Sequence, residues 1–350
     1  MIASDQHVLS RRFKSGLSII LNRPGALNSL SEAMLDRIDS LLSEALADGA
    51  CLFVLFYSSS HKGFCAGGDV KELARLGSIN QFDKVDSFFR KEYGLDLRLH
   101  LFPKPVIVIA DGITMGGGLG IAAGAGISIA TQRTRMAMPE TRIGFFPDVG
   151  STGWMFVRCP KGYPEYLGLT GYEMAGSECV RLGFATHFMQ SEKIPALIEM
   201  LENIDLKAGK DKHGMMSNLL VKISGFLNFN IPVNHEMDVW VEKYFMGKSD
   251  IREILEPLSR CHEQEKHCSD VFAGIAERSP TALLLTLKLL RHNEGRSIAD
   301  VFATELKAAG FIAREPDYIE GVRARLVDKD DKPRWVPDSV DKVDAGKFIP

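Results

Sequence analysis

The sequence predicts an α/β fold in which short apolar strands alternate with amphipathic helices. Two observations carry this prediction. Compact apolar runs at residues 17–22, 52–57 and 106–110 are separated by segments whose apolar residues recur at helical spacing. Glycine-rich turns follow the last two of these runs. Because parallel strands separated by helices are joined by crossover connections, we expect a mainly parallel sheet.

The first elements are defined by their boundaries. The strand at 17–22 ends at Arg23-Pro24-Gly25, and Ser31 is placed to cap the next helix. The apolar residues of that helix are Met34, Leu35, Ile38, Leu41, Leu42 and Leu46. Helices at 70–76 and 81–101 follow the strand at 52–57, and Phe102-Pro-Lys-Pro105 stops the second helix before the strand at 106–110.

The second half of the chain is predicted to be mainly helical. Strands at 127–131 and 136–138 are followed by a loop at 139–153. The expected helices beyond it cover 177–182, 194–204 and 211–223, and others begin at 248–250 and 279–281. The charge run Asp328-Lys-Asp-Asp-Lys332 is expected to be a solvated turn.

Composition excludes several classes of protein. The 350 residues are 45% hydrophobic, which suffices for a buried core, and the net charge of −3 offers no excess of positive charge for nucleic acid. The apolar run 116–130 is shorter than the roughly 18 to 20 residues of a membrane span. Six cysteines without a secreted-domain spacing favour a reducing compartment. We therefore expect a soluble protein, cytoplasmic in a bacterium; Arg11, Arg12 and Lys14 leave a mitochondrial origin open.

The segment 113–120 predicts an anion site. It follows an apolar strand, contains Gly116-Gly117-Gly118, and opens a small-residue helix whose N-terminal N–H groups would favour negative charge. It lacks the Lys of a P-loop and the acidic partner of a dinucleotide fingerprint. The alternative is a tight turn with close helix packing through Gly120 and Gly124. A second segment, 63–69, also carries glycines near a helix start, and two such loops can supply paired N–H donors to an oxyanion.

These segments resemble a known family, the crotonase (enoyl-CoA hydratase/isomerase) superfamily. The likeness lies in Phe64-Cys-Ala-Gly-Gly-Asp69, Gly112-Ile-Thr-Met-Gly-Gly-Gly118, Met138-Pro-Glu-Thr141, Gly144-Phe-Phe-Pro-Asp-Val-Gly150 and Glu320-Gly-Val-Arg-Ala-Arg-Leu-Val-Asp-Lys-Asp330. It runs from about Leu17 to Pro337 and is strongest to the 3-hydroxyisobutyryl-CoA hydrolases within the superfamily.

The resemblance implies a fold, a reaction and a site. The fold would be a spiral of ββα turns at 1–225 and a helical C-terminal region at 226–350 that covers the acyl pocket, although no sequence boundary there is sharp. The reaction would be hydrolysis of 3-hydroxyisobutyryl-CoA in valine breakdown. The oxyanion donors would be the N–H groups of Gly68 and Gly117, and Ala66 would contact the substrate. CoA is part of the substrate, so no separate cofactor is implied; a homo-oligomer is possible.

Three acids are candidates for the chemistry. Glu140 follows proline in an apolar setting, where desolvation would raise its pKa; on local sequence alone it could equally be a surface turn acid. Asp148 is also an acid among apolar residues, with a turn-forming role as the alternative. By resemblance, Glu140 is catalytic, Asp148 matches the hydrolase pattern, and Glu92 contacts the acyl group, although a helix pattern alone would make Glu92 an exposed acid.

Position 120 distinguishes reactions within the superfamily. Enoyl-CoA hydratases carry a second catalytic Glu there, and this chain has Gly120, which argues against a hydratase. The alternatives are a Δ3,Δ2-enoyl-CoA isomerase, which needs one base, and a non-catalytic acyl-CoA-binding protein. Cys65 is expected to pack rather than react, and Ser151 lacks a nucleophile-elbow context. Cys261-His262 and His267-Cys268, expected on one helix, match no zinc spacing, so no metal is expected.

Overall fold

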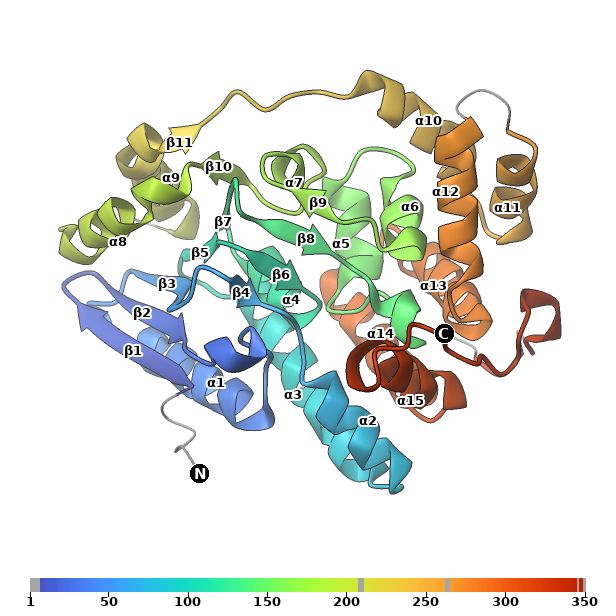
Figure 1. Ribbon diagram of the computed structural model, residues 1–350. Coiled ribbons are helices and arrows are strands. Elements are labelled where there is room, and N and C mark those ends of the chain that lie inside the picture. The colour runs from blue at the N-terminus through green and yellow to red at the C-terminus, as the bar shows by residue number, and fades with distance from the viewer. Residues whose placement is uncertain (1–6, 207–210, 262–264, 345, 349–350) are drawn as a thin grey trace. The chain divides into compact units, whose positions relative to one another are not determined.

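The computed structural model describes residues 7–206, 211–261, 265–344 and 346–348. The chain forms two compact units, each built from three segments. Figure 1 labels the helices and strands of both. The first unit contains residues 1–68, 94–136 and 174–233, and the second contains residues 69–93, 137–173 and 234–350. The predicted division cuts the chain once, at residue 225, whereas each of these units combines three separate segments. The predicted division stays a prediction.

The first unit is built on a seven-stranded sheet with the order β1-β2-β3-β5-β7-β10-β11. The strands are β1 (Val8–Phe13), β2 (Gly16–Leu21), β3 (Phe53–Ser58), β5 (Val106–Ala110), β7 (Ile127–Thr131), β10 (His187–Met189) and β11 (Leu227–Asn228). All pairs from β2 to β10 are parallel, and only the outer pairs β1·β2 and β10·β11 are antiparallel. The predicted parallel sheet is therefore confirmed.

The central strands of this sheet, β3, β5 and β7, are apolar on both faces and therefore need cover from helices. The helices of the first unit are α1 (Glu32–Ala47), α4 (Gly117–Gly124), α7 (Glu178–Arg181), α8 (Ile194–Asn203) and α9 (Lys212–Ile223). The side chain of Ser31 accepts a hydrogen bond from the N–H of Met34, which confirms the predicted cap of α1. One core cluster joins sheet residues such as Ile107 and Ile129 to Leu197 of α8 and Leu219 of α9.

A second, four-stranded sheet positions the glycine segments. Its strands are β4 (Gly63–Cys65), β6 (Ile113–Met115), β8 (Arg135–Ala137) and β9 (Met174–Ala175). β4 and β6 are parallel, with Gly63 opposite Ile113 and Cys65 opposite Thr114. The two glycine loops leave neighbouring strands in the same direction, so they begin side by side.

The second unit is mainly helical, as predicted for this part of the chain. Its elements are α2 (Val70–Ser78), η3 (Glu140–Ile143), α5 (Ser151–Arg158), α6 (Tyr163–Thr170), α10 (His235–Phe245), α11 (Arg252–Ser259), α12 (Glu265–Ala276), α13 (Pro280–Asn293), α14 (Ile298–Ile312), α15 (Pro316–Val322) and the π-helical turn η6 (Arg323–Val327). The long helix α3 (Phe82–His100) belongs to this unit up to Tyr93 and to the first unit from Gly94. The run 328–332 is exposed, as expected.

Two expectations about local structure were wrong, and one strand was missed. Strand β1 was not predicted. The segment 139–153 is not a loop throughout, since it contains η3 and the start of α5. Cys261 lies between α11 and α12 rather than on one helix with Cys268. The two cysteines form a disulfide, which the reducing compartment inferred from cysteine spacing does not predict. His262 lies outside the described residues.

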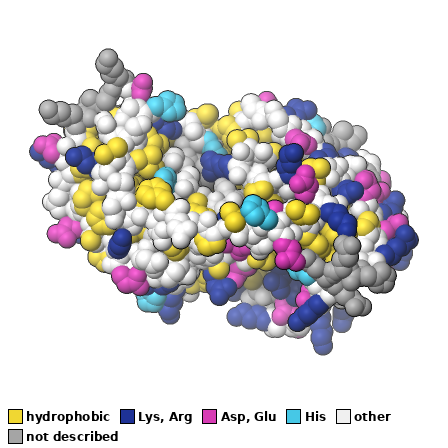
Figure 2. Space-filling view, turned by 90° about the horizontal axis from the view of Figure 1, so that it is seen from above, with side chains coloured by type: hydrophobic (Ala, Val, Ile, Leu, Met, Phe, Trp, Pro, Cys, Tyr) yellow, Lys and Arg dark blue, Asp and Glu magenta, His cyan; other side chains and the backbone are white. Residues whose placement is uncertain are grey.

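Surface charge is mixed. On the face shown in Figure 2, Lys and Arg side chains are interspersed with Asp and Glu, and apolar side chains form small groups between them. Among the described residues, no helix has both the length and the apolar character to cross a membrane.

Candidate active site

The two glycine loops of the first unit lie against each other. A Cβ on Gly67 would stand 3.4 Å from the backbone nitrogen of Gly117, and one on Gly118 would stand 2.2 Å from the carbonyl oxygen of Cys65. Gly117 is the first residue of α4, where an N–H has no acceptor within its own helix. Gly68 pairs with Leu30 in an isolated parallel bridge. The structure therefore brings the predicted donor loops together in one place.

Helix α4 also packs closely on α3, as the alternative for this segment predicted. A Cβ on Gly120 would stand 2.3 Å from a carboxylate oxygen of Asp96, and one on Gly124 would stand 2.6 Å from the Cβ of Leu99. Asp96 is buried. No larger side chain fits at position 120 unless the Asp96 carboxylate moves, so the close packing of this helix is confirmed, and the anion site stays a prediction.

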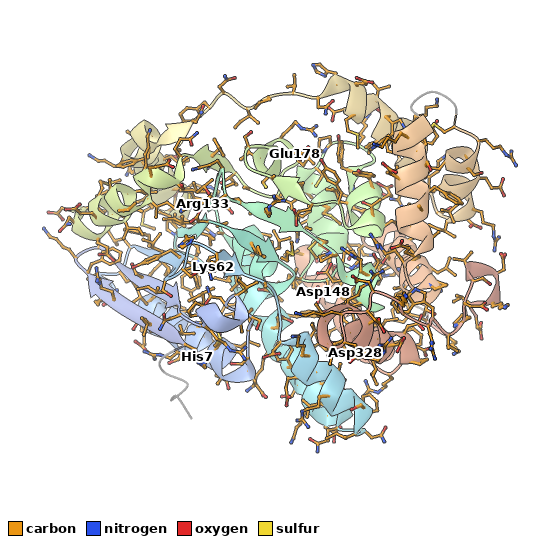
Figure 3. The ribbon with its side chains drawn as sticks, viewed as in Figure 1. His7, Lys62, Arg133, Asp148, Glu178 and Asp328 are labelled. Carbon is orange, nitrogen blue, oxygen red and sulfur yellow. A yellow bond between two sulfur atoms is a disulfide. The ribbon has the colours of Figure 1, made fainter. Side chains whose placement is uncertain are left out.

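The second unit gathers the candidate acids. Glu92 lies on α3, Glu140 begins η3, and Asp148 precedes α5, where Figure 3 labels it. All three are buried, so the surface interpretations of Glu92 and Glu140 are wrong. A fourth buried acid, Glu305 of α14, completes the group, which we call the acid cluster: Glu92, Glu140, Asp148 and Glu305.

Burial raises the pKa of every member of the acid cluster, and the charge of Asp148 raises it further for the other three. For Glu140 and Glu92, burial is the larger cause and the Asp148 charge the second, and both pKa values lie well above the usual range. Burial raises the pKa of Asp148 to about 7, against the lowering effect of a hydrogen bond from Tyr93. Burial raises the pKa of Glu305 to about 8, against its bonds with Thr152 and Gly150. Asp148 and Glu305 can therefore hold and release protons near neutral pH.

Several buried polar atoms in and beside the acid cluster have no hydrogen-bond partner among the described residues. The hydroxyl of Tyr93 donates to Asp148 Oδ2 at 2.8 Å. By contrast, Glu92 Oε1, Glu140 Oε2 and the Tyr318 hydroxyl are buried without a hydrogen-bond partner among the described residues. The pKa of Tyr318 is raised by burial and then by the charges of Asp148 and Glu92. Unpaired buried polar atoms are rare in folded proteins and suit a site that a polar substrate completes.

Close backbone contacts and aromatic rings hold these side chains. A Cβ on Gly144 would stand 2.3 Å from the carbonyl oxygen of Asp317, and one on Gly321 would stand 2.4 Å from the backbone of Ile143, so α15 packs directly on η3. The ring of Phe145 lies 5.3 Å from Phe89 and 5.4 Å from Tyr318, measured between centroids. Glu140 and Tyr318 are thus placed from facing elements of one unit.

The turn after Asp148 has an unusual backbone. Val149 and Gly150 both have positive φ, 53° and 80°. For a β-branched residue such as Val149 this conformation is strained, by about 1–3 kcal/mol, and persists only where the surroundings impose it. The indole N–H of Trp154 donates to the carbonyl of Val149 at 3.2 Å, and the N–H of Gly150 donates to Glu305 at 2.6 Å. The surrounding unit therefore holds Asp148 on a constrained turn.

Comparison with known proteins identifies the family. A family model described as enoyl-CoA hydratase/isomerase matches residues 17–348. The chain belongs to the enoyl-CoA hydratase/isomerase family. Among curated members, the mitochondrial 3-hydroxyisobutyryl-CoA hydrolase of Gallus gallus is 35% identical over 333 residues, covering 95% of this chain and 84% of that protein. The enzyme of that name from Dictyostelium discoideum is 32% identical over 351 residues, covering 97% and 90%.

Solved structures of this family confirm the fold. A carnitinyl-CoA dehydratase from Mycobacterium thermoresistibile has a TM-score of 0.87 at 28% identity and covers 99% of this chain and 97% of its own. An enoyl-CoA hydratase from Rhodobacter sphaeroides 2.4.1 has a TM-score of 0.82 at 29% identity, with 97% and 95% covered. The family resemblance and the crotonase fold are thus confirmed, while the names of these relatives include both hydrolases and hydratases.

Within the family fold, the predicted residues fall into two sets. Ala66, Gly68 and Gly117 belong to the first unit; Glu92, Glu140 and Asp148 belong to the second. Tyr93, Asp96, Glu305 and Tyr318 were not predicted from the sequence. Only Glu305 carried a local signal, because it shares the buried stripe of α14 with Val301, Ala308 and Ile312, where an acid is out of place.

Proposed function

We propose that this chain hydrolyses the thioester of 3-hydroxyisobutyryl-CoA, a step of valine breakdown, to the 3-hydroxy acid and CoA. The names of its curated relatives support this reaction. The observation at position 120 favours hydrolysis over hydration. Enoyl-CoA hydratases of the family have a second catalytic Glu at this position, whereas here the residue is Gly120 and the Asp96 carboxylate fills the space beside it.

The proposed mechanism divides the work between donors and acids. The N–H groups of Gly68 and Gly117 stabilise the charge that develops on the thioester oxygen. Glu140 either takes a proton from the attacking water, or attacks the carbonyl carbon itself to give a mixed anhydride that water then cleaves. In both routes the C–S bond breaks, the sulfur leaves with the electron pair and is protonated, and one water is consumed.

The raised pKa values support acid–base work by a pair. Asp148 has a pKa of about 7, and its charge helps to raise the pKa of Glu140. Ionisation of one acid therefore disfavours ionisation of the other, so the proton that the pair retains must lie on Asp148 when Glu140 acts as the base. Asp148 would orient either the reacting water or the 3-hydroxyl of the substrate.

Release of CoA tests this proposal. The protein is incubated with 3-hydroxyisobutyryl-CoA and a thiol reagent, and free CoA is followed with time. A hydrolase releases CoA catalytically, with Glu140→Gln as the inactive control. An isomerase would instead shift the double bond of a 3-enoyl-CoA without releasing CoA, and a binding protein would retain the ester unchanged; either result rejects the proposal. The reaction would take place in the mitochondrial matrix of a eukaryote or the cytoplasm of a bacterium.

A further inference from the structure

Glu305 makes an unusually complete set of contacts with the turn that carries Asp148. Its Oε2 accepts the N–H of Gly150 at 2.6 Å, and its Oε1 accepts the N–H and the hydroxyl of Thr152 at 3.1 and 2.5 Å. The amide of Asn293 donates to the same hydroxyl at 2.8 Å. Glu305 is 0% exposed, so water does not compete for these bonds.

These bonds stabilise the backbone at the start of α5, directly after Asp148 and Val149. Gly150 is the N-cap of α5 and Thr152 its second residue, so the carboxyl group supplies acceptors to N–H groups that the helix leaves unpaired. The same bonds fix Gly150 directly after Val149, the strained residue. Asp148 lies immediately before, with one carboxylate oxygen on the Tyr93 hydroxyl. Asp148 is therefore held from both sides, by Tyr93 through its side chain and by Glu305 through the backbone that follows it.

We propose that Glu305 is a positioning residue for Asp148: it holds the turn 148–152 in the conformation that aims the Asp148 carboxylate at Tyr93 and the substrate. This inference rests on the proposed hydrolase function for its kinetic consequence. Its structural consequence, the retention of the Tyr93–Asp148 hydrogen bond, does not depend on that function.

A purely structural role makes a different prediction. If Glu305 only caps α5, its loss lowers stability and reduces activity by the same factor whether or not Asp148 is intact. If Glu305 acts through Asp148, its loss matters only while the Asp148 carboxylate is present, because residues that act as a unit are non-additive. A double-mutant comparison separates the two accounts.

The experiment uses two variants, Glu305→Met alone and Glu305→Met combined with Asp148→Asn. Methionine keeps the length of the side chain and removes both carboxylate oxygens. In the otherwise unchanged protein, kcat should fall about 10²-fold, the usual effect of misplacing a catalytic group by about 1 Å, with KM within about threefold. With Asp148→Asn present, the further loss of kcat should be under about threefold, while the melting temperature falls equally in both. Equal kinetic losses in both proteins would overturn the inference.

Glu165 provides the matched control. It is a buried acid of the same unit that accepts the N–H of Gly247 at 3.0 Å and pairs with Arg291, so its bonds do not involve the turn 148–152. Glu165→Met should lower the melting temperature and leave kcat within about threefold. If Glu305→Met does not fold, Glu305→Gln, which keeps the shape and one acceptor, is compared with Glu165→Gln in the same way.

A crystal structure of the Glu305 variant decides the inference independently of activity. We expect the Tyr93 hydroxyl and Asp148 Oδ2 to separate beyond hydrogen-bond distance; retention of the 2.8 Å contact would overturn the inference. Failure of the proposed function is recognised separately, because the unsubstituted protein would then release no CoA.

Discussion

Asp148→Asn should make the protein more stable at alkaline pH while it severely lowers kcat. Asp148 is buried in the acid cluster, and burial raises the pKa of its carboxyl group from 3.8 to about 7. The folded protein therefore binds this proton more tightly than the unfolded chain does. The stability linked to the proton is fully present below pH ~4, the unfolded pKa, and is lost as the pH rises through the folded pKa.

The size of the effect follows from the shift. A shift from 3.8 to about 7 corresponds to roughly 4 kcal/mol, at ~1.4 kcal/mol for each pKa unit. Asparagine avoids this penalty, since its side chain does not ionise and its oxygen can still accept the Tyr93 hydroxyl. The protein loses about 1 kcal/mol of stability if the amide N–H groups of this asparagine have no hydrogen-bond acceptor. We expect a net gain of about 3 kcal/mol above pH 8.

Urea unfolding of both proteins between pH 5 and 8.5 measures the difference. The stability gained by Asp148→Asn should grow by about 1.4 kcal/mol per pH unit from pH 5 to pH 7 and then level off. Asp83→Asn, a change at an exposed acid of the same unit, serves as the control. A loss of stability that is equal at every pH would mean that Asp148 merely caps its turn, and the linkage argument would be refuted.

Three further predictions concern the reaction. Gly117→Pro should lower kcat about 10²- to 10³-fold, because it deletes one oxyanion donor. The fold should survive, because Pro is tolerated at the first residue of a helix. An unchanged kcat would mean that the glycine turn serves packing only. Glu140→Gln should nearly abolish CoA release and leave binding of the ester, measured by calorimetry, close to normal; weakened binding at an unchanged kcat would contradict its catalytic role. Crotonyl-CoA should not be hydrated, because Gly120 supplies no second acid; rapid decay of enoyl absorbance would reject the hydrolase assignment and point to Asp96.

Much of the fold was predictable because its signals are local. Strands β5 and β7 are buried along their whole length and therefore appear as unbroken apolar runs, and Ser31 marks the start of α1. Strand β1 was not predicted because it lies at the edge of the sheet and is mostly exposed. Its residues Ser10-Arg11-Arg12 therefore show no apolar pattern.

The site was only half predictable for a related reason. Glycine turns and acids in apolar surroundings can be recognised from neighbouring residues, as Gly117, Glu140 and Asp148 were. The contact between Gly150 and Glu305 joins residues 155 positions apart, and no local pattern specifies which distant side chain will meet a turn. The helix pattern alone predicted that Glu92 would be exposed, but the residue is buried. Its burial depends on elements far along the chain, which a local pattern does not reveal.

The arrangement of the cysteines determines how turnover can be observed. A thiol reagent that reports free CoA also reacts with accessible protein thiols. Cys51, Cys65 and Cys179 are buried, burial raises the pKa of the Cys159 thiol well above its usual range, and Cys261 and Cys268 are joined to each other. The native protein should therefore consume little reagent itself, so that continuous colorimetric recording is practicable, provided that no reductant opens the bond between Cys261 and Cys268 and adds two thiols to the background.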